Sequence, residues 1–180
     1  MANIAGFIGI GVSGVALLFA ITALAADKWE SGDVIIETIS VKSLKVGLWE
    51  ICYKAGLKST CYDIKDASKI LTVTDEQKNS VKACKAMIFL AIFTTTGAIV
   101  CAGLMMFVMK DKKTLSFAAG GLNFASGFFL MIAMAIYFDK VKTSGSDLDY
   151  GFVLDIIAWL AAWAAGGIFI ASKFLTMDCQ

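Results

Sequence analysis

Four apolar runs, each long enough to cross a lipid bilayer, constrain this chain more than any other feature of its sequence. Crossing about 30 Å of hydrocarbon takes about 20 helical residues, and each run reaches that length with almost no charge. The pattern predicts an all-α membrane protein, a four-transmembrane helix bundle that is left-handed as most membrane bundles are. We place the helices at residues 4–26, 86–109, 115–138 and 151–172 of a single membrane domain spanning 1–180.

The first run has a second interpretation, as a secretory signal peptide. Ala23-Leu24-Ala25 resembles a cleavage site. However, no basic segment precedes the run, and it exceeds the about 7 to 15 apolar residues of a signal sequence. We therefore expect an uncleaved membrane helix.

Lysines at the ends of these runs indicate how the chain is oriented. Three lie in the link Lys110-Asp111-Lys112-Lys113 between the second and third runs, and Lys173 follows the fourth. Because cytoplasmic loops carry an excess of lysine, we expect both termini in the cytoplasm. The expected location of this multi-pass protein is the plasma membrane. Residues 27–85 and 139–150 then form the two extracellular loops.

Two of the five cysteines, Cys52 and Cys61, share the first extracellular loop. Strand-like sequence flanks a turn signal, Ala55-Gly56, between them. A disulfide persists in the oxidising space outside the cell. We predict a disulfide between these two residues, against the alternative of two free thiols.

The other cysteines lie in or near the membrane. Cys84 at the mouth of the second helix and Cys101 deep within it are expected to pack as small apolar residues. Cys179 follows the fourth helix in a short cytosolic tail. It is a candidate for lipidation by palmitate, with a plain reduced thiol as the alternative.

The first loop reads as a small antiparallel sheet followed by a helix. Segments rich in β-branched residues or partly alternating predict strands at 34–41, 45–53 and 59–64, with 71–73 as a candidate fourth. Thr74-Asp75-Glu76-Gln77 then has the form of a capping box. The second membrane helix is therefore expected to begin outside the bilayer, near Asp75.

A sheet this small cannot bury enough apolar area to stand alone. We expect the sheet to pack against the outer surface of the helix bundle. Trp29 and Trp49 are expected at this interface, where an indole offers an apolar body and a donor N–H. The alternative is two unrelated tryptophans of the membrane belt.

The loop motif resembles a known superfamily. Trp29, the Gly47-Leu48-Trp49 step, and Cys52 with Cys61 are similar to the first loop shared by claudins, the peripheral myelin protein and epithelial membrane proteins, the lens fibre intrinsic membrane protein and gamma-type calcium-channel subunits. The third and fourth runs resemble the peripheral and epithelial membrane protein branch. The matching segments are Ala119-Gly120-Gly121, Phe124, Ala125-Ser126-Gly127, Ala133-Met134-Ala135-Ile136-Tyr137, Ser146-Asp147, Tyr150-Gly151-Phe152 and Ala158-Trp159.

Small residues recur at four-residue spacing in three of the runs. Such stripes let helix backbones approach closely in a membrane. We expect them to pack inside the bundle. The stripes are Ala5, Gly9 and Ser13, then Gly121 and Ala125, and then Ala158, Ala162 and Gly166.

Two polar residues within the runs are candidates for intramembrane contacts. Asn123 is expected to hydrogen-bond between helices, for about 0.6 to 2 kcal/mol. Asp155 lies about one turn inside the outer end of the fourth helix, and ionisable residues there are functional candidates by default. Its structural interpretation is an ion pair with Lys82 or Lys85.

The inventory of side chains argues against an enzyme. The chain contains no His and no Arg, no Gly-rich phosphate loop, and no set of acids and cysteines with metal-ligand spacing. We expect no catalytic residue, no cofactor, no metal and no nucleic-acid partner.

Two functional classes remain open. Resemblance to the claudin, myelin and epithelial proteins implies cell–cell adhesion, a junctional role or membrane organisation, through contacts of the extracellular sheet with a second copy or a claudin-like neighbour. Resemblance to the gamma-type proteins implies an auxiliary subunit of an ion channel or receptor. We favour the first class. In both, the partners are the lipid bilayer and another membrane protein.

Overall fold

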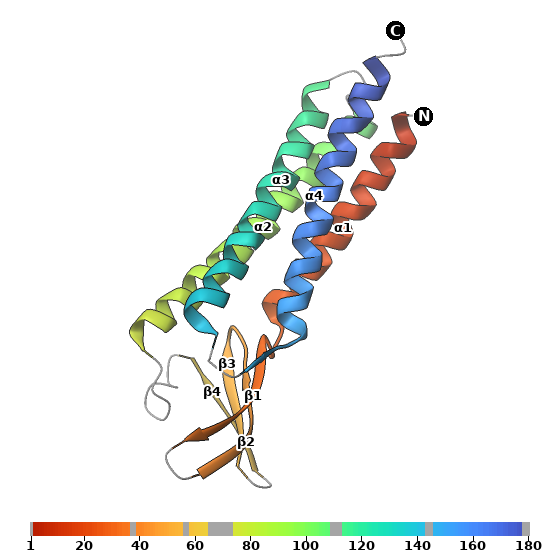
Figure 1. The fold of residues 1–180 in the computed structure, drawn as a ribbon. Helices are drawn as coiled ribbons and strands as arrows, with labels where there is room; N and C mark the ends of the chain where they lie inside the picture. The colour runs from red at the N-terminus through yellow and green to blue at the C-terminus, as the bar shows by residue number, and fades with distance from the viewer. Residues whose placement is uncertain are drawn as a thin grey trace.

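The computed structural model describes residues 2–36, 39–55, 58–64, 74–108, 113–142 and 146–177. Four long helices form one elongated bundle with a small sheet at one end (Figure 1). Each helix is long and apolar enough to cross a membrane, which confirms a multi-pass membrane protein. The helices are α1 (Ala2–Ala25), α2 (Asp75–Phe107), α3 (Lys113–Ile136) and α4 (Tyr150–Met177).

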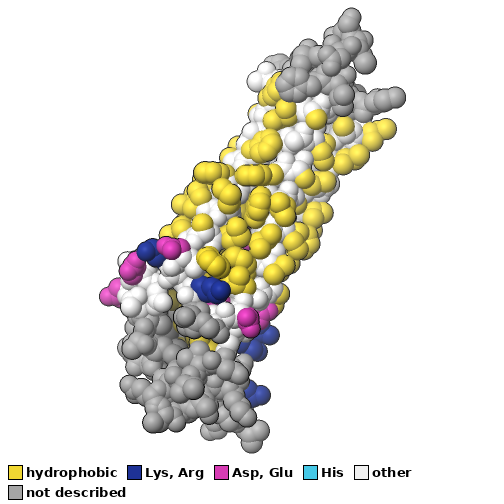
Figure 2. Space-filling view, viewed as in Figure 1, with side chains coloured by type: hydrophobic (Ala, Val, Ile, Leu, Met, Phe, Trp, Pro, Cys, Tyr) yellow, Lys and Arg dark blue, Asp and Glu magenta, His cyan; other side chains and the backbone are white. Residues whose placement is uncertain are grey.

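The helices pack in a closed ring. α1 contacts α2 and α4, and α3 contacts the same two helices. α1 begins and α4 ends at the end of the bundle away from the sheet (Figure 1). On the face that Figure 2 shows, hydrophobic side chains are spread along the helices, while the charged side chains gather towards the sheet. This surface suits a bilayer around the helices and water around the sheet.

Small residues bring α3 and α4 close together. A Cβ on Gly120 would lie 3.2 Å from the carbonyl oxygen of Gly166, and one on Gly127 would overlap the ring of Trp163. The predicted packing face through Gly166 is confirmed. The predicted stripe through Gly121 is wrong, because a Cβ there would meet nothing within 4 Å. The packing face of α3 is rotated by one residue.

On α1, the predicted small-residue face also packs inside the bundle. A Cβ on Gly9 would lie 2.8 Å from the ring of Phe169 in α4. Ser13, one turn further on, is fully buried. Close approach of α1 and α4 therefore depends on the absence of larger side chains at these positions.

The sheet has five antiparallel strands in the order β4-β3-β2-β1-β5. Four strands come from the first loop, and the fifth comes from the second loop. Their bounds are β1 (Glu30–Ile36), β2 (Ile39–Val46), β3 (Glu50–Ala55), β4 (Lys58–Asp63) and β5 (Asp147–Leu148). A small sheet with a disulfide in the first loop is thus confirmed.

The strand boundaries differ from two of the predictions. Residues 34–41 were expected to be one strand, but Ile36 pairs with Ile39, so this segment is a hairpin between β1 and β2. Residues 45–53 cover the end of β2, a short turn and most of β3. β-branched composition indicates extended backbone and does not locate a chain reversal. The candidate strand at 71–73 lies outside the described residues.

The start of α2 follows its local sequence. The Thr74 hydroxyl accepts a hydrogen bond from the Gln77 N–H, and the Gln77 side chain accepts one from the Thr74 N–H. The predicted capping box is therefore confirmed, and two acids in the first turn, Asp75 and Glu76, suit the helix dipole.

Candidate functional site

The site lies where the sheet meets the adjacent end of the bundle, and it begins with the last turn of α1. The final carbonyls of a helix have no partner within the helix. The indole N–H of Trp29 donates to the Ala23 carbonyl at 2.8 Å, and that of Trp49 donates to the Leu24 carbonyl at 2.7 Å. Both tryptophans of the loop motif therefore cap the same helix end.

Trp29 joins three elements beneath the sheet. Its side chain is fully buried, and its ring centroid lies 4.9 Å from that of Tyr137 and 6.2 Å from that of Phe152, the latter edge-on. Tyr137 begins a π-helical turn, Tyr137–Val141, that follows α3, and Phe152 lies in the first turn of α4. Aromatic contacts of this kind add about 0.5 to 1.5 kcal/mol beyond their burial.

Trp49 occupies the border of the site. Its side chain is 46% exposed, and the Lys85 ammonium lies 4.0 Å from the centroid of its ring. A partly exposed indole with a cation over its ring is typical of a tryptophan at the depth of the lipid headgroups.

The turn between β2 and β3 requires glycine. A Cβ on Gly47 would lie 2.7 Å from the carbonyl oxygen of Asp27, so no larger residue fits there. The Gly47 N–H donates to the Glu50 carbonyl at 3.0 Å, and the neighbouring Leu48 is fully buried. The Gly-Leu-Trp step thus has three roles in consecutive residues. Gly47 allows two backbone segments to approach closely, Leu48 is a buried apolar side chain, and Trp49 caps the end of α1.

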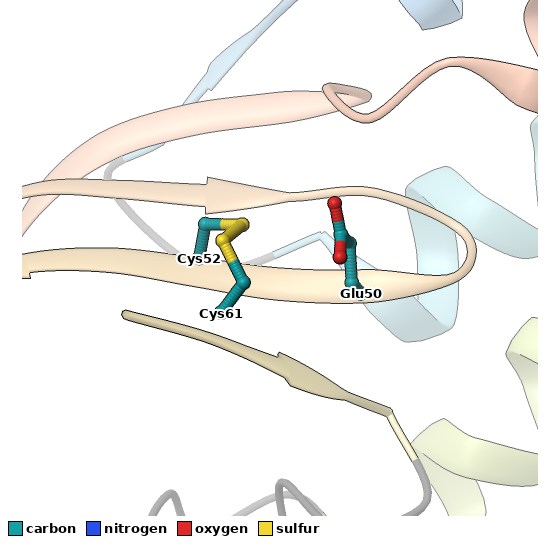
Figure 3. Close-up of side chains that lie close together, drawn as sticks. All are labelled: Glu50, Cys52 and Cys61. Carbon is teal, nitrogen blue, oxygen red and sulfur yellow. A yellow bond between two sulfur atoms is a disulfide. The ribbon is translucent and has the colours of Figure 1, made fainter. Parts of the chain in front are cut away.

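The predicted disulfide is present. Cys52 of β3 and Cys61 of β4 are directly opposite each other and bonded, with their Cα atoms 4.0 Å apart. Figure 3 shows the two sulfur atoms joined between the strands. The alternative of two free thiols is wrong for this structure.

Glu50 lies beside the disulfide, within 4.8 Å by its carboxylate oxygens (Figure 3). Three such residues resemble a metal-ligand set. A metal binds cysteine as thiolate, and these two sulfurs are bonded to each other. A single carboxylate remains, so the cluster does not fit a metal ion.

The second loop closes the site from the other side. The Asp149 N–H donates to the Trp29 carbonyl, and the Gly151 N–H donates to the Lys28 carbonyl, both at 2.9 Å. A Cβ on Gly151 would lie 2.6 Å from the Lys28 carbonyl oxygen. The sequence indicates Gly151 only through the family resemblance, and it does not predict β5.

A side-chain bond joins the end of α1 to the start of α4. The Tyr150 hydroxyl donates to Asp27, which lowers the pKa of that carboxyl. The Asp149 carboxylate accepts a bond from the Tyr150 N–H at 2.7 Å and so caps α4.

Asn123 forms an interhelical contact in the structure. The Ser13 hydroxyl of α1 donates to the Asn123 amide oxygen at 3.2 Å. The Asn123 amide nitrogen donates to the Ala119 carbonyl of its own helix at 3.1 Å. Both side chains are fully buried, so this bond crosses the interior of the bundle.

The expected ion pair of Asp155 is not formed. Its side chain is fully buried, and neither carboxylate oxygen has a hydrogen-bond partner among the residues that the structure describes. Lys85 instead lies over Trp49, and the Lys82 side chain is exposed. Pairing with either lysine was therefore a wrong prediction.

The remaining cysteines are placed as follows. Cys84 is fully buried and donates its S–H to the Ala133 carbonyl at 3.4 Å, while Cys101 is half-buried. Both are free thiols packed among helices. Cys179, the candidate for lipidation, lies outside the described residues.

One of two comparisons with known proteins identifies a family for this chain. The family model described as the PMP-22/EMP/MP20/Claudin family matches residues 1–170, and a search of curated proteins found no match. The matched region contains the capping tryptophans, the Gly-Leu-Trp step and the disulfide. This chain belongs to the PMP-22/EMP/MP20/Claudin family of non-enzymatic membrane proteins.

Proposed function

We propose that this protein acts in cell–cell adhesion or junctions at the plasma membrane, or organises the membrane there, through its extracellular sheet. The observation that carries the proposal is the double cap on α1. Trp29 and Trp49 hold the sheet on the bundle through neighbouring carbonyls, so its outward face keeps a fixed direction relative to the membrane.

The two faces of the sheet differ in the way that a contact surface requires. Side chains alternate between faces along a strand, and directly opposite residues share a face. Leu44, Val46 and Ile51 lie on one face and are buried towards the bundle. The other face, with the disulfide, presents Lys54, Ser59 and Asp63, all exposed.

The orientation in the membrane is part of the proposal. The disulfide supports an oxidising compartment around the sheet, and the lysines that follow the apolar runs support a cytoplasmic location for the opposite end of the bundle. Both termini would then be cytoplasmic. Tags at either terminus should bind antibody only after the cells are permeabilised.

A mixed-cell experiment tests the adhesive role. Cells that lack junctional proteins express this chain with a fluorescent tag and are mixed with untagged, non-expressing cells. The protein should concentrate where two expressing cells meet, and Lys54→Glu should reduce this enrichment. Lys113→Glu, the same change of charge at the far end of α3, is the matched control and should leave it intact.

Two results would reject the adhesive role. One is equal enrichment at borders with non-expressing cells. The other is native co-purification of one ion channel or receptor in stoichiometric amount, which would support the auxiliary-subunit function instead.

A further inference from the structure

Asp155 is the only buried charged residue in the described parts of the four membrane spans. It lies five residues after Tyr150, the first residue of α4, which places it about 7 Å along the helix at about 1.5 Å per residue. Its side chain is 0% exposed, and both oxygens lack a hydrogen-bond donor among the described residues.

Among the described residues, Cys84 is a titratable neighbour of Asp155, and Lys85 is in turn a neighbour of Cys84. α2 contributes Cys84, which is close enough for its charge to interact with that of Asp155, but its S–H donates to a carbonyl of α3. Tyr137, in the turn after α3, interacts with Cys84, and its buried hydroxyl also lacks a partner among the described residues. β1 contributes Glu30, which interacts with Tyr137. α1 has no charged residue from Ala2 to Ala25.

The nearest cations do not reach the carboxyl. Lys85 lies over Trp49, Lys82 is exposed, and neither forms an ion pair with Asp155 in the described structure. An ionised carboxylate buried without a donor or a counter-charge is strongly unfavourable, and such a group neutralises instead. A proton bound to the Asp155 carboxylate would neutralise its charge and would need no cavity.

We propose that Asp155 is an intramembrane proton-binding site, occupied in the folded bundle and emptied only when the outer end of the bundle admits water. Phe152, three residues earlier on α4, packs against Trp29 and Tyr137 at ring-centroid distances of 6.2 and 6.3 Å. Ionisation of Asp155 would bring water to the aromatic cluster against which Trp29 packs. Alkaline pH outside the cell would thereby weaken the attachment of the sheet to the helix bundle.

Infrared spectroscopy of the full chain in lipid nanodiscs, labelled with ¹³C-aspartate, tests the site. At neutral pH the wild type should show one labelled carboxylic-acid C=O band, and Asp155→Asn should lack it. The Tm of the wild type should fall by about 3 °C or more between pH about 7 and about 9, while that of Asp155→Asn stays flat. Asp155→Leu, which also cannot ionise, should be equally flat.

The wild-type spectrum decides the matter even if both variants fail to fold. Absence of a labelled carboxylic-acid band at neutral pH would overturn the proposal, as would a Tm profile in Asp155→Asn identical to that of the wild type. A Tm raised by sodium chloride over choline chloride at equal ionic strength, in the wild type alone, would also overturn it, because the occupant would be a metal cation.

Discussion

The indole N–H of Trp29 donates a hydrogen bond to the backbone carbonyl of Ala23, six residues earlier in the chain. This bond satisfies a carbonyl at the end of α1, whose last turn contains no basic residue. The same side chain packs against the rings of Tyr137 and Phe152. One residue thus ends a membrane helix and anchors the first strand.

Removing only the N–H of Trp29 should destabilise the protein. Trp29→Phe keeps an aromatic ring but leaves the Ala23 carbonyl with the longer hydrogen bond from the Ala26 N–H, at 3.3 Å, so the loss of one hydrogen bond should cost about 0.5 to 1.5 kcal/mol. Thermal unfolding in nanodiscs measures this, with a fall in Tm of about 2 to 4 °C per kcal/mol. Trp163→Phe is the matched control, because the Trp163 N–H has no partner among the described residues. Equal losses in the two variants would contradict a cap at the end of α1.

Glycine should be indispensable at the turn between β2 and β3. Gly47→Ala places a methyl group against the Asp27 backbone and should cost about 1 to 3 kcal/mol, with reduced delivery to the cell surface. Gly121→Ala provides the control. Its Cβ meets nothing within 4 Å, and alanine favours a helix by about 1 kcal/mol, so the variant should be neutral or slightly more stable. A Gly47→Ala protein with the wild-type Tm would show that the turn tolerates a side chain.

Loss of the disulfide should weaken the sheet and leave the bundle intact. Cys52→Ser or Cys61→Ser should cost about 2 to 5 kcal/mol and reduce the amount of protein at the cell surface. Surface biotinylation and the gel shift on reduction report the two effects. Cys101→Ala removes a thiol that forms no disulfide and should change neither. A gel shift that persists in Cys52→Ser would show a different pairing.

Acid should release the bond between α1 and α4. The pKa of Asp27 is lowered, chiefly by the bond from Tyr150, so its stabilisation is present above the unfolded pKa and is lost as pH falls through the folded pKa. Tyr150→Phe should therefore flatten the Tm profile below pH about 4. Tyr62→Phe, which removes a hydroxyl from the sheet, should keep the wild-type slope. An unchanged slope in Tyr150→Phe would mean that the bond does not form in the membrane.

Local features of this chain could be predicted from the sequence because local chemistry determines them. Uninterrupted apolar runs lead to membrane helices, since a lipid-exposed backbone has no other way to satisfy its polar groups. The capping box at Thr74 is complete within four residues. The pairing of Cys52 with Cys61 follows from topology, because no other cysteine lies between the end of α1 and the start of α2.

Contacts between distant segments could not be predicted in this way. β5 is only two residues long and forms because Asp147 and Leu148 meet β1 across the second loop. The need for glycine at position 47 comes from the Asp27 backbone, twenty residues away. Nor could the sequence show that Asp155 has no lysine partner among the described residues, since Lys82 and Lys85 are near enough along the sheet-side end of α2 to suggest one.

The central claim is that the two indoles hold the sheet in a fixed position on the bundle. Pulsed electron resonance between spin labels introduced as unnatural amino acids at Ser59 of β4 and Lys82 of α2 measures this directly. The account predicts one narrow distance distribution in the wild type and a broad one in the variant carrying Trp29→Phe and Trp49→Phe. A broad distribution in the wild type, or an equally narrow one in the double variant, would contradict it.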